Sequence, residues 1–177
     1  MNTRQLTKTA LLLALCVASQ FLKNLSVYIT GPIINCILIA AVVFCGLPGG
    51  ITISLVTPLT SWLITGSPLM SALPLIIPCV MLGNLLLALS VWVCTRKAKE
   101  KKHLLWGILS GAILKAAFMG ASISLLILPL LGAVSGLPAP AIAAARVTFS
   151  LTQLITALIG GALAMAVVTA LRHTGKQ

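Results

Sequence analysis

The chain has 177 residues, of which 59% are hydrophobic and only 7% carry a charge. Soluble domains contain about a quarter charged residues, so this composition excludes a soluble fold and predicts an integral membrane protein. The net charge of +11 comes from twelve Lys and Arg residues against one acid, Glu100. Because the basic residues flank apolar runs, we assign them to membrane topology and anionic headgroups and expect no nucleic-acid binding.

Six apolar runs predict six transmembrane helices, at about residues 6–23, 32–48, 50–66, 72–95, 104–131 and 146–171. Each run has about the length that a helix needs to cross a bilayer, and Gly, Pro, Asn or charged residues separate them. The runs are apolar on all sides, unlike the alternating strands of a β-barrel. We therefore expect an all-α membrane protein, a compact bundle of six transmembrane helices that forms one integral membrane domain over residues 1–177.

The first run follows Arg4 and Lys8, and this opening also resembles a secretory signal peptide. Leu15 is too large for the position before Cys16 in a lipoprotein cleavage site, and no small-x-small site ends the run. We therefore expect the run to remain in the protein as its first helix.

Ala10, Ala14 and Ala18 follow one another at four-residue intervals in the first run, so they share one face of a helix. Small residues at this spacing let another helix approach closely in a membrane. The alanine strip can serve packing inside the bundle or binding of another membrane protein, and the sequence leaves both open.

The second and third runs are short and meet at residues 47–50, Leu-Pro-Gly-Gly, which predicts a tight hairpin. Pro58 lies inside the third run, and Pro74 and Pro78 lie in the outer part of the fourth. Each proline frees a backbone carbonyl. Such a site is either a packing kink or part of a binding cavity.

Three groups of basic residues predict the orientation of the bundle. Arg4 and Lys8 open the chain, residues 96–102 hold five basic side chains, and Arg172 and Lys176 follow the sixth run. Six helices place all three groups on one side, which the positive-inside rule makes cytoplasmic. Both termini are therefore expected in the cytoplasm.

The segment from Thr7 to Ala14, Thr-Lys-x-Ala-Leu-Leu-Leu-Ala, resembles the first helix of the substrate-binding S components of energy-coupling factor (ECF) transporters. The AxxxA spacing is that family's recurrent motif, and the resemblance extends to the length, the six runs and the basic segment after the fourth run. It implies that Ala10, Ala14 and Ala18 face a membrane scaffold subunit, the T component, which couples to two ATPases. It also implies a prokaryotic plasma-membrane protein with an outer substrate pocket, closed by the loops before the second, fourth and sixth helices.

Several kinds of chemistry have no support in the sequence. The chain has no Gly-rich GK[ST] loop, so ATP would be hydrolysed by partner subunits. No acid, His or Ser–Lys pair at membrane depth forms a catalytic set, so we expect no enzyme and no cofactor. His103 and His173 lie at the cytoplasmic edge and no CxxC pair is present, so we expect no metal site.

Lys115 lies about eleven residues into the fifth run, near the predicted centre of the bilayer. A charge at this depth is costly and usually faces a cavity or a partner. The only acid, Glu100, lies in the cytoplasmic loop. Lys115 can therefore bind an anionic ligand, stay neutral, bond to carbonyls freed by the prolines, or extend towards an interface.

Other polar residues lie at comparable depth. Asn84 is halfway along the fourth run and Asn35 is near the outer end of the second. Arg146, Ser150 and Gln153 are spaced i, i+4 and i+7, so one continuous helix would place them on one face. Such residues bind a ligand or join helices, and Arg146 equally suits a helix start among headgroups. We assign six residues to substrate binding: Asn35, Asn84, Lys115, Arg146, Ser150 and Gln153.

The predicted function is that of an ECF S component, a membrane receptor for a small organic and anionic micronutrient such as a vitamin. The alternative is a self-assembling passive channel or structural bundle whose alanine strip forms homo-oligomers. An S component would purify with ATPases and bind one ligand, whereas a channel would form a defined homo-oligomer and conduct. The sequence does not name the substrate.

Overall fold

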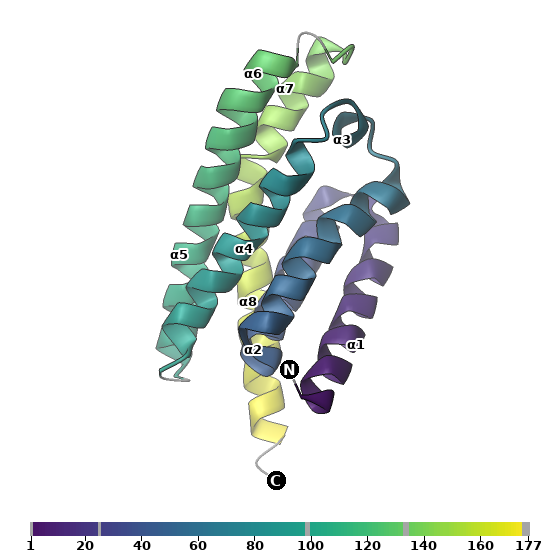
Figure 1. Cartoon of the computed structure of the whole chain (residues 1–177). Coiled ribbons are helices and arrows are strands. Elements are labelled where there is room, and N and C mark those ends of the chain that lie inside the picture. Colours follow the sequence, from purple (N-terminus) through teal and green to yellow (C-terminus); the bar gives the residue numbers. More distant parts are fainter. Residues whose placement is uncertain (1, 25, 98–99, 133–134, 175–177) are drawn as a thin grey trace.

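The structure, a computed structural model, describes residues 2–24, 26–97, 100–132 and 135–174. Within these residues every regular element is a helix, and the helices pack side by side in one elongated bundle (Figure 1). The predicted all-α fold is confirmed. Lys99 and Lys176, which belong to two of the basic groups, lie outside the described residues.

Helix α1 spans Thr3–Gln20 and begins with a capping box between Asn2 and Gln5. The Asn2 side-chain oxygen accepts from the Gln5 backbone N–H at 2.9 Å, and the Gln5 side chain accepts from the Asn2 backbone N–H at 3.2 Å. This exchange satisfies two backbone donors that a helix start otherwise leaves free. A short 3₁₀ helix, η1, follows over Phe21–Asn24.

Helix α2 covers Val27–Thr65 and contains a sharp change of direction at Gly46. The φ of Gly46 is 76° and its ψ is −173°, a conformation that glycine adopts readily and residues with a Cβ rarely do. The chain turns there, so that two helical halves pack against each other near residues 42–50 (Figure 1). These halves correspond to the predicted second and third helices.

The next two elements are α3, Pro68–Ala72, and α4, Ile76–Thr95. Pro74 lies in the turn between them, so α4 begins four residues later than the start expected at residue 72. Pro78 lies in the first turn of α4, where the missing N–H breaks no helical hydrogen bond.

The fifth predicted helix is irregular in its second half. It consists of α5, Lys101–Met119, a π-helix η2 over Gly120–Ile127, and α6, Leu128–Leu131. π-Helices are rare and widen the backbone locally. The irregular half lies away from the chain termini (Figure 1).

The last predicted helix is divided into α7, Ala139–Thr148, and α8, Leu151–Thr174. Helix α7 begins inside the segment 132–145, which we expected to be a loop. Extended Pro138 precedes it, and the alanines that follow are the strongest helix formers. The connection between the fifth and sixth helices is therefore shorter than predicted.

Four helical segments of the described chain are long and apolar enough to cross a membrane: Val27–Thr65, Ile76–Thr95, Lys101–Leu131 and Ala139–Arg172. The first of them turns at Gly46, and α1 packs beside it, which gives the six helices predicted. Helix α1 begins and α8 ends at one end of the bundle, here the termini end, while α3 and α6 lie at the opposite end (Figure 1).

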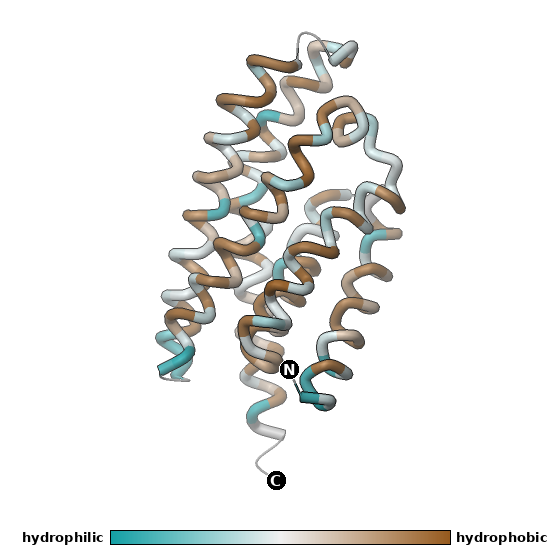
Figure 2. The backbone as a smooth tube through the Cα atoms, in the orientation of Figure 1, coloured by the Kyte–Doolittle hydropathy of each residue, from teal (hydrophilic) through white to brown (hydrophobic). Residues whose placement is uncertain are grey.

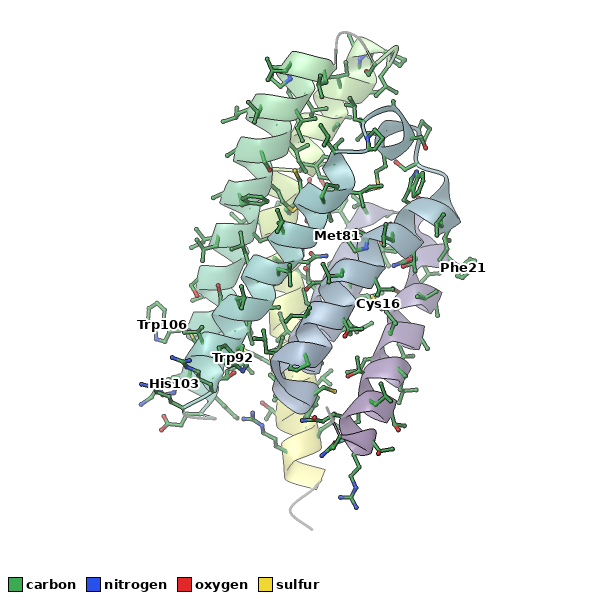
Figure 3. The ribbon with its side chains drawn as sticks, viewed as in Figure 1. Cys16, Phe21, Met81, Trp92, His103 and Trp106 are labelled. Atoms are coloured by element: carbon green, nitrogen blue, oxygen red, sulfur yellow. The ribbon has the colours of Figure 1, made fainter. Side chains whose placement is uncertain are left out.

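The helices are mostly hydrophobic along their length, and hydrophilic residues gather near the termini end (Figure 2). Many large hydrophobic side chains, such as Leu63 and Leu125, are exposed on the outside of the bundle. Phe21 and Trp106 project from the bundle, each with 66% of its area exposed, whereas Cys16 points towards α2 (Figure 3). An apolar exterior of this kind suits contact with lipid rather than water.

Candidate functional site

A cavity of about 460 Å³ opens among the helices in the half of the bundle opposite the termini end. Ligand sites in proteins commonly measure about 300–1,000 Å³. Both halves of α2 and the elements α3, α4, α5, α7 and α8 contribute to the cavity. The described residues that line it are Val27, Thr30, Gly31, Ile34, Asn35, Thr57, Pro58, Ser61, Ser67, Leu69, Met70, Val80, Asn84, Lys115, Ala141, Ala144, Ala145, Thr148, Phe149 and Gln153.

A cluster of three polar side chains forms the inner end of this cavity. The Lys115 Nζ donates to Asn35 Oδ1 at 2.7 Å and to Asn84 Oδ1 at 2.8 Å. Each of the three residues is at most 3% exposed. Asn35 and Asn84 both lie eight residues after the first residue of their helix, which at 1.5 Å per residue is about 12 Å along the helix.

Close packing of α4 on α5 directs Lys115 towards Asn84. Gly107, Gly111 and Lys115 follow one another at four-residue intervals and share one face of α5. A Cβ on Gly111 would lie 2.8 Å from the Leu87 side chain and 3.2 Å from its Cα. Only glycine therefore allows the two backbones to approach this closely.

Close packing of α8 on α2 holds Asn35 in a similar way. A Cβ on Gly160 would lie 2.6 Å from the Pro32 carbonyl oxygen and 2.7 Å from the Asn35 Cβ. Helix α8 thus contacts the backbone of α2 at the residue that meets Lys115. The polar cluster is held by two helix–helix contacts that depend on glycine.

The rest of the cavity wall is apolar with scattered hydroxyl groups. Helix α7 presents one face to the cavity, with Ala141, Ala144, Ala145 and Thr148 at i, i+3, i+4 and i+7. Among the described lining residues, Lys115 is the only one with an ionisable side chain and Phe149 the only aromatic one. The cavity thus combines one polar end with a mostly apolar body.

The sequence model of the family described as "ECF transporter, substrate-specific component" matches residues 4–172. This chain belongs to that family. Comparison with curated proteins and with solved structures gave no match. As an ECF S component, the protein is a transport subunit and not an enzyme, and it is a multi-pass membrane protein of a kind typical of prokaryotic plasma membranes.

The S component brings four of its predicted site residues to one cavity: Lys115, Asn84, Asn35 and Gln153. Within the cavity, Gln153 is separate from the lysine cluster, and its Nε2 donates to the Thr148 carbonyl oxygen at 3.2 Å. The sequence assigned Lys115 and both asparagines to one binding site, but it did not indicate that the Lys115 ammonium would donate to both side-chain oxygens.

Arg146 and Ser150 do not line the cavity of the S component. The helix expected over 146–171 is interrupted at Phe149, so the face that these residues would share with Gln153 is not continuous. The Arg146 side chain is exposed, and its carbonyl oxygen accepts from Ser150 Oγ at 2.6 Å and Ser124 Oγ at 3.0 Å.

The alanine strip of Ala10, Ala14 and Ala18 lies on the exposed face of α1. The opposite face of α1 packs on α2, where Gln20 Nε2 donates to the Thr57 carbonyl oxygen at 3.1 Å. The sequence left open whether the strip packs inside the bundle or binds another membrane protein. In the structure the strip does not pack against the other helices of the S component.

Thr30, Thr57 and Ser61 also line the cavity and were not predicted. Hydroxyl residues are common inside membrane helices because they bond to a carbonyl one turn earlier, so their presence alone gave no signal. A better signal was the Gly107, Gly111 and Lys115 spacing, which indicates that the lysine faces a neighbouring helix. Among the described residues, no group of His, Cys, Asp and Glu side chains forms a metal site.

Proposed function

We propose that this S component binds a small organic micronutrient with an anionic group in the cavity. A T component and two ATPase subunits would then drive its uptake. The observation that carries the proposal is the placement of Lys115, the only charged side chain of the described cavity wall, at the inner end. A buried charge is stable only when it is paired or well hydrogen-bonded, and both of its contacts here are neutral.

The charge balance of the cavity favours an anion. An ammonium group has three N–H donors, and Lys115 uses two of them on Asn35 and Asn84. The single acid of the chain, Glu100, pairs instead with Lys102 at 3.0 Å outside the cavity. A ligand carboxylate would supply both the missing acceptor and the missing charge.

Native mass spectrometry of the purified chain, followed by an uptake assay, tests this function. We expect one small molecule to co-purify, and cells to accumulate it only when the T component and both ATPases are also present. A homo-oligomer that conducts solutes without any ATPase would instead support the passive channel. Loss of uptake on removing either ATPase separates the two functions.

We also propose that the alanine strip binds the T component. Ala14→Trp places a bulky ring on the exposed face of α1, which prevents close approach of another helix. Uptake should be lost, while the isolated chain still binds its ligand. Ala117→Trp, at an exposed alanine of α5, is the matched control and should keep both. Equal loss of binding in Ala14→Trp would contradict the partner role.

We further propose that the termini end faces the cytoplasm, as the basic groups predict. A reporter domain fused to the C-terminus should then report a cytoplasmic position. A reporter inserted at Gly136, in the turn before α7, should report an external one. The reverse pattern would overturn this orientation and place the cavity on the cytoplasmic side.

A further inference from the structure

We infer that the substrate is a monoanion whose single carboxylate binds at the inner end of the cavity and whose neutral body extends towards α3 and α7. This inference rests on the proposed function, because it specifies the chemical class of the ligand for the same cavity. It follows from three features of the cavity: the direction of its amide groups, its single charge and the character of its outer wall.

The direction of the two amide groups follows from their contact with Lys115. An ammonium can only donate, so the oxygens of Asn35 and Asn84 must point at it. The two Nδ2 atoms therefore point away from the ammonium. Within the described chain neither Nδ2 forms a hydrogen bond, and neither is among the fully buried atoms without a partner, so both are accessible from the cavity.

The inner end of the cavity thus presents mainly donors. The third N–H of Lys115 and the N–H groups of Asn35 and Asn84 face the cavity, while each amide oxygen already accepts from Lys115 and points at it. A carboxylate accepts through two oxygens and donates nothing. An amine or an amide nitrogen of a ligand in the same place would point its own N–H groups at these N–H groups. The arrangement therefore favours a ligand group that accepts hydrogen bonds.

The charge of the ligand follows from the absence of a second cation on the described cavity wall. Lys115 balances one negative charge. A second anionic group would lie beside residues such as Met70, Ala141 and Phe149, where an unpaired charge is costly. Dicarboxylates and phosphate esters therefore fit less well than a monocarboxylate.

The outer wall determines the character of the remaining part of the ligand. Apolar side chains of α3 and α7 alternate there with hydroxyl groups such as Thr30, Ser61 and Thr148. The hydroxyls of Thr30 and Thr148 already donate to the backbone carbonyl oxygens of Ser26 and Ala144, so towards a ligand they act as acceptors. They suit a neutral body that is largely apolar and carries a few hydroxyl or amide groups.

Thermal unfolding of the purified full chain tests the inference without knowledge of the natural substrate. The probes are sodium butyrate, butyramide and sodium succinate, each compared with sodium chloride at equal ionic strength. A ligand that binds only the folded state raises the Tm. Butyrate should raise it clearly, butyramide should leave it unchanged, and succinate should raise it less than butyrate. Equal shifts with butyrate and butyramide, a larger shift with succinate, or no shift with butyrate would overturn the inference.

The variant Asn84→Asp examines the donor arrangement itself. Aspartate has the same shape and can still accept from Lys115, but it removes one amide donor and cancels the charge of the cavity. The Tm shift with butyrate should disappear. Asn2→Asp is the matched control, because aspartate caps a helix as well as asparagine does, and it should respond as wild type. A normal butyrate shift in Asn84→Asp would overturn the inference. If this variant does not fold, the comparison of butyrate, butyramide and succinate on the wild-type protein still tests the inference.

The failure of this inference can be told apart from the failure of the proposed function. A co-purified nutrient without an acidic group, or with two of them, would refute the monoanion and leave the S component function in place. Transport without ATPases would refute the function itself.

Discussion

The two halves of the bundle are built in different ways. Towards the termini end, long segments of α1, α2, α4, α5 and α8 surround one apolar cluster, with Leu38, Leu87, Val91 and Ile108 among its buried members. Towards the opposite end, a second cluster is formed by α3, α4, the end of α5, η2, α6 and α7, and its buried side chains include Met119. The first half is regular and tightly packed, whereas the second contains short helices, the π-helix and the cavity.

The difference shows how one chain can combine a tightly packed half with a half that contains a cavity. In the regular half, glycines such as Gly111 and Gly161 allow helices to touch, since a Cβ on Gly161 would collide with the Ile108 side chain. In the irregular half, the breaks at Pro74 and Phe149 separate the elements. The Lys115 cluster lies at the boundary, where packing holds it on one side and the cavity reaches it from the other.

Among substitutions that test this difference between the two halves, Lys115→Met is expected to have the largest effect, a loss of ligand affinity. Removing one partner of a buried charge pair costs about 3–5 kcal/mol, and each ~1.4 kcal/mol is tenfold in affinity. Ligand affinity should therefore fall at least a hundredfold, while the Tm without ligand stays the same or rises. Calorimetry with the identified ligand measures the first and thermal unfolding the second.

Lys102→Met provides the matched control, because this lysine is exposed at the start of α5 and should affect neither quantity. Normal ligand affinity in Lys115→Met would show that the lysine is structural. A large loss of stability would show that the cluster belongs to the packed half rather than to the cavity.

A smaller effect, on folding rather than binding, is expected for Gly111→Leu in the regular half. The new side chain has no space between α4 and α5, and overpacking of this kind costs about 1–3 kcal/mol. The Tm in detergent should fall clearly. Ala117→Leu on the exposed face of the same helix should leave it unchanged. Similar Tm values for the two variants would mean that the helices are not in close contact at Gly111.

The smallest effect is expected for Ala144→Leu in the irregular half. This residue lines the cavity, so three added carbon atoms enter open space and reduce the room for ligand. Affinity should fall about tenfold, or ~1.4 kcal/mol, without a change in the Tm of the free protein. Ala143→Leu, exposed and outside the cavity lining, should keep wild-type affinity. A lower Tm for Ala144→Leu would show that α7 is as tightly packed as the regular half.

The sequence by itself determined the membrane class, the six helices and the presence of a tight turn between the second and third helices, expected at residues 47–50 and found at Gly46. These follow from run length, composition and the backbone freedom of glycine and proline, which are local properties. The sequence also singled out Lys115, because a charge inside an apolar run is costly wherever the helix packs. The family resemblance rests on the motif in the first helix together with the chain length, the six runs and the basic segment after the fourth run.

Only the tertiary structure decided what Lys115 contacts and which polar residues share its cavity. Asn35 and Asn84 are 80 and 31 residues away from it along the chain. In a soluble helix the apolar stripe shows which face points inward, but helices that meet lipid are apolar on all sides and carry no such stripe. The face that such a helix turns towards its neighbours is set by small residues such as Gly111 and Gly160, where another helix approaches closely. This face depends on the shapes of two helices together, so the sequence of one helix does not show it. For the same reason the break at Phe149, which leaves Arg146 outside the cavity, was not predictable from residue spacing alone.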